Sequence, residues 1–185
     1  EWFDSSFFGY KPVEADVMDP QTRIFHECAW GSLEDAGYIP GAYKGRIGVY
    51  AGASAHLNWE ILSNISGKSD ILGKFASWQL YDKDFMSTRV SYSLNLLGPS
   101  MVVNTACSTS LVAVHLACQG LLSGECHMAL AGGVRVSIPG KIGALHQEGM
   151  IIASDGHCRT FDARANGTVF GEGAGIVVLK PLENA

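Results

Sequence analysis

Three short apolar segments, set between segments of helical pattern, constrain the fold of this chain most. They are RIGVYAGA (residues 46–53), SMVVNTA (100–106) and MALAGGVRV (128–136), and IVVLK near residue 180 adds a fourth. Each is short and mostly apolar, which is typical of strands in a largely buried sheet. Helical patterns between these segments predict an α/β fold built around a largely buried sheet.

The helical segments carry recognisable ends. Residues 19–37 predict a helix that Asp19 caps, that has Pro20 in its first turn and that Gly37 ends. Helices are also expected over residues 83–96 and over 108–124, the second stopped by Gly124, whereas residues 54–81 show only weak helical signals around 57–65. The buried stripe expected on the first of these helices consists of Phe25, Cys28, Ala29, Leu33 and Ala36.

Composition excludes several classes of protein. Hydrophobic residues make up 47% of the chain and charged residues 17%, which argues against disorder, and the formal net charge of -5 disfavours a general nucleic-acid binder. No apolar run reaches the ~18 residues of a membrane span, and no signal peptide is recognisable. The five cysteines form no CxxC pair and no metal-type cluster. Their odd number and apolar surroundings suit a reducing compartment and predict a cytoplasmic protein.

The junction VVNTACSTSLVAVH places Cys107 where a buried strand ends and a helix begins. This position exposes the sulfur on a tight turn, and the helix dipole favours the thiolate form. It also aims the backbone N–H of Cys107 toward an oxyanion that would form on an attacked carbonyl. A structural cysteine in a packed turn is the other interpretation, and the pattern alone leaves both open.

Longer motifs on both sides of Cys107 resemble one family. NTACSTSLVAVHLACQGLLSGECHMALAGGV is similar to the active-site segment of polyketide and fatty-acid ketosynthases, where the cysteine of TACSxS accepts the acyl group. PVEADVMDPQTRIFHECAWGSLEDAGY, DFMSTRVSYSLNLLGPS and EGMIIASDGHCRTFDARANGTVFGEGAGIVVLKPLENA extend the likeness over nearly the whole chain. The resemblance implies a ketosynthase domain of a modular polyketide synthase.

The implied fold is thiolase-like, with two similar halves stacked in five αβαβα layers. Residues 1–185 would form most of the N-terminal half, without its first strand and without the C-terminal half. Both ends, at Glu1 and Ala185, lack a polar linker and are therefore expected to be cuts through a larger protein.

The resemblance also implies a reaction, a decarboxylative Claisen condensation. Cys107 takes an acyl group from the phosphopantetheine arm of an acyl carrier protein and passes it to the carbanion formed from malonyl-carrier protein. The family's two catalytic histidines and its second oxyanion donor belong to the C-terminal half, so residues 1–185 alone are expected to be inactive and poorly folded. No directly bound cofactor and no metal are expected. The expected partners are the carrier protein, the other domains of the synthase and a second copy of the domain, with neither nucleic acid nor membrane.

Four further side chains are candidates for substrate binding by resemblance. Trp78 and Asp82 correspond to a loop that lines the acyl pocket of the second copy in a dimer, and Phe170 and Glu172 match segments near the active-site entrance. A scaffolding role for the loop is the alternative for the last two. The strand around residues 101–104 is expected to pair with its copy across the dimer.

Other polar residues receive weaker assignments. Arg159, Phe161 and Asp162 also match the entrance region, with loop scaffolding as the favoured alternative. No catalytic role is expected of the histidines. His115 lies ~12 Å beyond Cys107 along its helix and is expected to pack against a neighbouring element. Structural or surface roles are expected for His26, His56, His127, His146 and His157.

Two other functions stay open on sequence alone. A family member that lacks a catalytic histidine only transfers or docks acyl chains, and the residues that decide this lie outside the sequence. A thiolase-type enzyme acting on coenzyme A thioesters is the third possibility, against which TACSTSLVAVH and DGHCRTFDARANG argue. Asn104 and the DKDF run hint at an assembly line with a separate acyltransferase.

Overall fold

The structure, a computed structural model, describes residues 2–55, 57–138, 140, 143 and 145–185. The described strands are β1 Ile47–Ala53, β2 Ser100–Val102, β3 Met128–Arg135 and β4 Gly173–Leu179. The α-helices are α1 Pro12–Val17, α2 Pro20–Asp35, α3 Leu57–Ile65, α4 Lys68–Leu72, α5 Lys74–Tyr81, α6 Met86–Ser93 and α7 Thr109–Leu122. Short 3-10 turns, η1 Lys83–Phe85, η2 Ala106–Ser108 and η3 Leu182–Asn184, complete the described elements.

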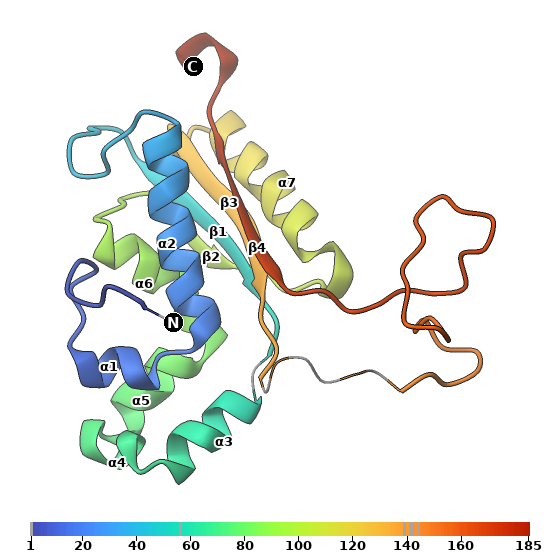
Figure 1. Ribbon diagram of the computed structural model, residues 1–185. Coiled ribbons are helices and arrows are strands. Elements are labelled where there is room, and N and C mark those ends of the chain that lie inside the picture. The colour runs from blue at the N-terminus through green and yellow to red at the C-terminus, as the bar shows by residue number, and fades with distance from the viewer. Residues whose placement is uncertain (1, 56, 139, 141–142, 144) are drawn as a thin grey trace.

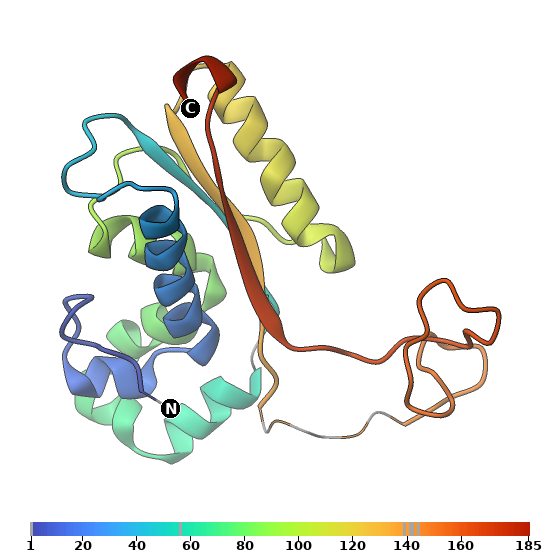
Figure 2. The same ribbon diagram turned by 45° about the horizontal axis from the view of Figure 1, so that its top comes forward.

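The four strands form one mixed sheet in the order β2-β1-β3-β4. β1 is parallel to both β2 and β3, whereas β4 is antiparallel to β3. α2 and α6 cover one face of this sheet and α7 covers the other (Figures 1 and 2). The α/β architecture expected from the sequence is therefore confirmed.

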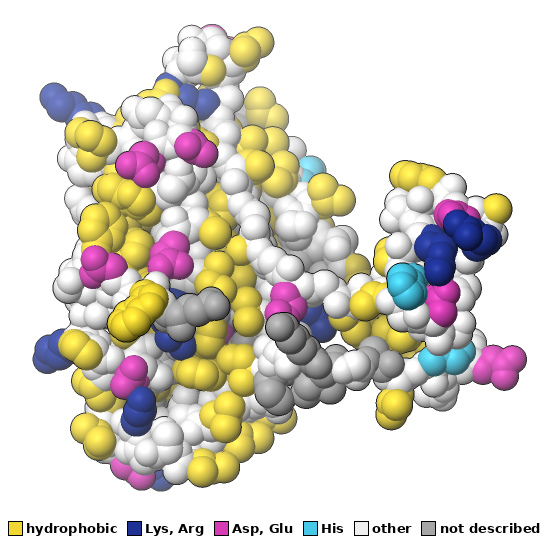
Figure 3. All heavy atoms as spheres, viewed as in Figure 1, with side chains coloured by type: hydrophobic (Ala, Val, Ile, Leu, Met, Phe, Trp, Pro, Cys, Tyr) yellow, Lys and Arg dark blue, Asp and Glu magenta, His cyan; other side chains and the backbone are white. Residues whose placement is uncertain are grey.

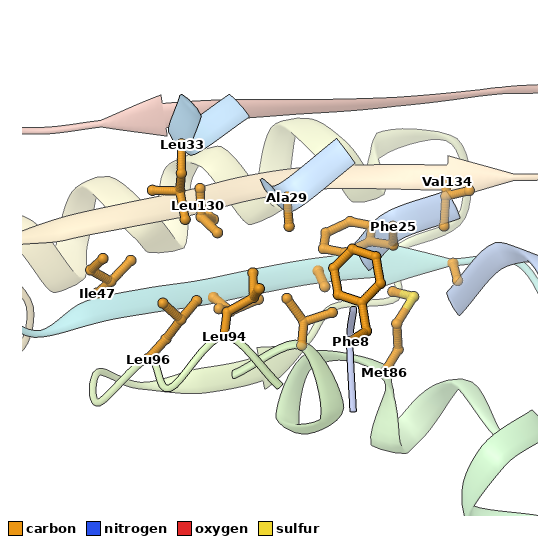
Figure 4. Packing of buried hydrophobic residues seen from close by; sticks show 14 of the residues in the cluster. Phe8, Phe25, Ala29, Leu33, Ile47, Met86, Leu94, Leu96, Leu130 and Val134 are labelled. Carbon is orange, nitrogen blue, oxygen red and sulfur yellow. The ribbon is translucent and has the colours of Figure 1, made fainter. Parts of the chain in front are cut away.

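The larger core lies between α2, α6 and the sheet (Figure 4). β1 is buried along its whole length, as expected for a strand inside a covered sheet. Successive side chains of β3 point to opposite faces. Leu130 and Val134 join the core under α2, and Ala129 and Ala131 join a second core under α7.

The predicted ends of α2 are confirmed. The Asp19 carboxylate accepts a hydrogen bond from the backbone N–H of Gln21 at 2.7 Å, and Gly37 has a φ of 79° just beyond the helix. Of the predicted stripe, Phe25, Ala29 and Leu33 are buried, Cys28 is half-buried and Ala36 is exposed. The prediction for Ala36 was wrong because the helix ends at Asp35 and the chain turns away there.

The strand predicted over residues 100–106 was too long. Only Ser100–Val102 pair as a strand, although the N–H of Val103 still donates to the carbonyl of Ala51 at 2.8 Å. Beyond it Ala106 has a φ of 53°, which turns the chain out of the sheet toward α7. The predicted strands over 46–53 and 128–136 are confirmed to within one residue.

The region before β2 contains more helices than expected. The weak signal around 57–65 is confirmed as α3, but α4 and α5 were not foreseen. Gly67 and Gly73, with φ values of 73° and 91°, separate these short helices. The helix predicted over 83–96 is a 3-10 turn followed by α6, and Asn95 at a φ of 53° ends it.

Residues 145–172 form a segment that projects away from the sheet and its helices before the chain returns as β4 (Figures 1 and 2). Within it Ile152 and Thr168 form an isolated bridge. Figure 3 shows apolar side chains exposed on this segment and on the body, and the exposed side chains of the segment include Leu145, Met150 and Phe161. No described helix combines the length and apolar character that crossing a membrane requires.

Candidate active site

Cys107 lies in the turn between β2 and α7, as the sequence predicted, and it is exposed. Hydrogen bonds hold the turn on both sides of the cysteine. The Thr109 hydroxyl accepts the N–H of Thr105 at 2.9 Å and donates to the carbonyl of Ala106 at 2.8 Å. The Ser108 hydroxyl donates to the carbonyl of Thr105 at 2.9 Å. Ala106 is thereby held in the left-handed region, which costs an alanine about 1–2 kcal/mol.

A row of glycines lets this turn approach the sheet. Gly52 on β1 pairs in register with Gly133 on β3, and Gly133 pairs with Gly175 on β4. A side chain at position 52 would collide with the methyl group of Thr109 and lie 3.0 Å from the carbonyl oxygen of Val103. Position 133 faces Ser110 of α7 at 3.5 Å, and position 175 faces open space. The missing side chains leave room for the start of α7 and for the pocket beside it.

A pocket of about 770 Å³ opens at this point, with Cys107 in its wall. It lies at the carboxyl ends of the parallel strands β1 and β3, where α/β proteins commonly bind ligands. Small side chains dominate its lining, which consists of Gly52, Ala53, Ser54, Ala55, Asn104, Ala106, Cys107, Thr109, Ser110, Gly133, Val134, Arg135, Gly173, Ala174 and Gly175. The backbone N–H of Cys107 makes no hydrogen bond to any described residue. It is therefore available as a hydrogen-bond donor.

A buried glutamine fixes two strand ends beside the pocket. Gln21 donates from Nε2 to the Ser54 carbonyl at 2.8 Å and accepts from the Ser54 hydroxyl at 2.8 Å. Its Oε1 also accepts the N–H of Val136 at 3.2 Å. One side chain of α2 therefore ties the end of β1 to the end of β3. No sequence pattern signalled this contact, because its partners are 33 and 115 residues away.

Two of the predicted site residues lie next to the pocket without lining it. The guanidinium of Arg135 stacks over the ring of Phe170, 4.7 Å from its centre. Glu172 accepts the backbone N–H of Ser137 at 2.8 Å, which is the scaffolding contact anticipated as its alternative. Arg135 itself, a pocket residue, was missed by sequence reasoning, although a charge at the end of a buried strand was a usable signal.

Trp78 and Asp82 come together elsewhere. Trp78 lies on α5 rather than on the expected loop, and its Nε1 donates to the Asp82 carboxylate at 2.8 Å. Neither side chain lines the pocket that contains Cys107. Phe75, Trp78 and Phe85 form an aromatic row, with 5.8 Å and 4.8 Å between successive ring centres.

The weaker entrance candidates lie on the projecting segment. Arg159 forms an ion pair with Asp155 at 2.6 Å, and Asp162 forms one with Arg164 at 2.9 Å. These pairs lower the pKa of both aspartates, in the first place through hydrogen bonds from the arginine side chains. The Phe161 ring is fully exposed. None of these side chains lines the pocket.

The described histidines also lie away from the pocket lining. His26 is buried, with ring nitrogens 3.1 Å from the Tyr10 hydroxyl and 2.7 Å from the Thr22 carbonyl, and burial lowers its pKa to about 4. His115 is exposed, so the expectation that it packs against a neighbour is wrong for this structure: it lies on the outer side of α7. His127 accepts the N–H of Arg46 at 3.0 Å. His146 and His157 contact backbone carbonyls, and His56 is outside the described residues.

The structure thus combines an exposed cysteine in a strand-to-helix turn, a pocket lined mostly by small residues and a mixed sheet covered by helices on both faces. The family model "Beta-ketoacyl synthase, N-terminal domain" matches residues 1–185, and the chain belongs to the β-ketoacyl synthase family. The chain is 50% identical over 190 residues to a phenolphthiocerol/phthiocerol polyketide synthase of Mycobacterium tuberculosis (strain CDC 1551 / Oshkosh), covering 99% of this chain and 13% of the relative. It is 42% identical to polyketide synthase ThaG of Burkholderia thailandensis, covering 99% of this chain and 3% of the relative.

Solved structures agree with this membership. Ketosynthase twelve of the bacillaene polyketide synthase of Bacillus amyloliquefaciens superposes with a TM-score of 0.87 at 38% identity, covering 96% of this chain and 31% of that one. The ketosynthase from module 1 of the bacillaene synthase of Bacillus amyloliquefaciens FZB42 gives a TM-score of 0.80 at 36% identity, covering 98% and 32%. The expected family and thiolase-like fold are thus confirmed. The chain spans about a third of these solved ketosynthases and a small part of the polyketide synthases.

Proposed function

We propose that Cys107 is the acyl-accepting nucleophile of a ketosynthase domain in a polyketide synthase. Its thiolate attacks the carbonyl of an acyl thioester, a carbon–sulfur bond forms to Cys107, and the bond to the donor sulfur breaks, releasing the donor thiol. The observation that carries this proposal is the exposed Cys107 sulfur in the wall of a pocket at the carboxyl ends of β1 and β3.

The backbone N–H of Cys107 is one oxyanion donor in this proposal. It has no hydrogen-bond partner among the described residues, so it can bind the negative oxygen of the tetrahedral intermediate. The start of α7 adds a favourable dipole at the same place. The Thr109 hydroxyl is a positioning group, because it holds the backbone on both sides of Ala106.

The second step of the proposed reaction is decarboxylative condensation. Malonyl-carrier protein loses carbon dioxide, and the resulting carbanion attacks the acyl-Cys107 carbonyl, so a carbon–carbon bond forms and the cysteine thiolate leaves. By resemblance, the two histidines for this step and a second oxyanion donor belong to the C-terminal half of the domain, whereas residues 1–185 form most of its N-terminal half. Residues 1–185 alone are therefore inactive in condensation.

The proposed partners follow from this chemistry. An acyl carrier protein brings the acyl and malonyl groups on its phosphopantetheine arm, and no cofactor is bound directly. A second copy of the domain pairs along β2. Among the described strands, β2 is at the edge of the sheet with β1 as its neighbour, and its Met101 is 39% exposed, so this edge is open for pairing. Trp78 and Asp82 lie toward the acyl pocket of that second copy, and Phe170 and Glu172 frame the entrance beside Cys107. A cytoplasmic location stays a prediction.

A domain that only transfers acyl groups is the alternative, and one experiment separates the two. The intact domain is incubated with acyl-carrier and malonyl-carrier protein, and carrier-bound products are identified by mass spectrometry. A condensing enzyme gives a β-ketoacyl product that Cys107→Ala abolishes. Acyl-Cys107 without any β-ketoacyl product identifies a transfer domain, and condensation that persists in Cys107→Ala contradicts the assigned role of the cysteine.

A further inference from the structure

Arg135 is the last residue of β3, and it points to the same side of the sheet as Cys107. Side chains alternate along a strand, and Ala129 and Ala131 pack under α7. Position 133 lies 3.5 Å from Ser110 of α7. Position 135, two residues further, therefore continues on the α7 face, where it lines the pocket together with Cys107.

Arg135 is the one charged side chain in the described lining of this pocket. No described carboxylate forms an ion pair with it, and no described residue accepts a hydrogen bond from its guanidinium. Its contact is a cation–π contact with the Phe170 ring, whose centre lies 4.7 Å from the central carbon of the guanidinium. A contact of this kind uses no hydrogen-bond acceptor, so the guanidinium N–H groups stay available to a ligand.

The strand end that carries Arg135 is held rigidly. Next to it the N–H of Val136 is bound by the buried Gln21, and the N–H of Ser137 is bound by Glu172. Gln21 also binds Ser54, a pocket residue that follows β1. The Arg135 guanidinium is thus held by its backbone and by the Phe170 ring. A charged group that is held in place in this way is suited to binding a polar group of a ligand.

We propose that Arg135 sets acyl specificity by favouring chains that carry a hydrogen-bond-accepting oxygen over plain hydrocarbon chains. This inference rests on the proposed function of Cys107 as acyl acceptor. An oxygenated chain gives the guanidinium a partner, whereas a hydrocarbon chain covers it and leaves its donors unpaired. The remaining lining of glycine, alanine, valine and small polar side chains accommodates either chain.

The phosphate of the carrier arm is the other oxygen-rich group that a guanidinium could bind. The arm holds its phosphate at the end far from the thioester. Arg135 shares the pocket of the sulfur that receives the acyl carbon. The position of Arg135 therefore favours an oxygen of the acyl chain as the group that it binds. Acyl donors with and without the phosphate distinguish this oxygen from the phosphate.

The test measures Cys107 acylation in the intact domain by intact mass, with butanoyl- and 3-hydroxybutanoyl-pantetheine, which lack the phosphate. We expect the wild type to prefer the hydroxylated chain. Arg135→Met lowers the ratio of the two rates by about tenfold, as for loss of a charged hydrogen bond, and Arg135→Lys lowers it less. The matched control is Arg46→Met, since Arg46 precedes β1 at its opposite end, roughly 20 Å along the strand.

Several results would overturn this inference. An unchanged ratio in Arg135→Met contradicts it, and so do equal losses with both chains. A loss confined to the phosphopantetheine forms of the same donors assigns Arg135 to the phosphate instead. The proposed function fails separately, by the absence of any adduct on Cys107 in the wild type with either donor.

Discussion

The side chain of Thr109 fills the space that a side chain on Gly52 would need. The same Thr109 holds the cysteine turn through its hydroxyl, so one residue both fits the sheet and shapes the turn. We expect Gly52→Ala to displace the turn and to slow Cys107 acylation by about a hundredfold, because small misplacements of reacting groups cost factors of this size. Acylation is followed by intact mass over time.

A second substitution tests that explanation directly. Thr109→Ser removes the colliding methyl group and keeps the hydroxyl, so it should restore part of the acylation rate lost in Gly52→Ala. Restoration will be incomplete, since the new methyl group still lies 3.0 Å from the Val103 carbonyl. If the double variant is no faster than Gly52→Ala, the collision is not the cause of the loss.

The Thr109 hydroxyl itself can be removed with little change of shape. Thr109→Val leaves the N–H of Thr105 and the carbonyl of Ala106 without their partner. We expect a destabilisation of about 1–2 kcal/mol and slower acylation, while Thr109→Ser stays close to wild type. Denaturant unfolding and acylation are measured on both variants, and equal behaviour of Val and Ser would contradict the role given to the hydroxyl.

Replacing Gln21 tests how the ends of β1 and β3 are held together beside the pocket. In Gln21→Leu the Ser54 carbonyl and the Val136 N–H lose their bonds to the side chain of a residue that is 1% exposed. We expect the free energy of unfolding to fall by about 2–4 kcal/mol, because the substitution removes three hydrogen bonds and each contributes about 0.5–1.5 kcal/mol. Gln119→Leu, on the exposed side of α7, is the matched control and should change it by less than about 0.5 kcal/mol. Similar losses in the two variants would refute the bridging role of Gln21.

Local signals in the sequence predicted the strands β1 and β3 and the helix α2, because apolar patterns and end residues mark all three. Cys107 was likewise placed at its strand-to-helix junction. The left-handed Ala106 was beyond prediction, since alanine rarely adopts that conformation. The glycine row and the placement of Arg135 depend on register between strands more than 40 residues apart in sequence, from Gly133 to Gly175. Pairings of that kind leave no local pattern.

His26 makes stability depend on pH. Burial lowers its pKa from 6.5 to about 4, and its surroundings are the Tyr10 hydroxyl, the Thr22 carbonyl and the positive charge of Arg89. The unfolded chain therefore binds the proton more readily. The stabilising contribution of the neutral ring is full above pH 6.5 and is lost as the pH falls toward 4.

At about 1.4 kcal/mol for each tenfold difference in proton affinity, the lowering of the His26 pKa to about 4 corresponds to roughly 3 kcal/mol. Between pH 6.5 and pH 4, the free energy of unfolding of the wild type should fall by this amount more than that of His26→Gln, because glutamine does not bind a proton in this range. Denaturant unfolding of the intact domain at several pH values measures it. Parallel pH profiles for the two proteins would mean that His26 is not a buried neutral histidine.

The role proposed for Cys107 requires that this cysteine be acylated, and the acylation can be measured. The intact domain is treated with an acyl thioester donor, and the adduct is located by intact mass and peptide mapping in wild type, Cys107→Ala and Cys158→Ala. The exposed Cys158, on the projecting segment, serves as the control thiol. We predict one acyl adduct on Cys107 in wild type and in Cys158→Ala, and none in Cys107→Ala. An adduct that persists in Cys107→Ala at the wild-type rate would show that another residue accepts the acyl group.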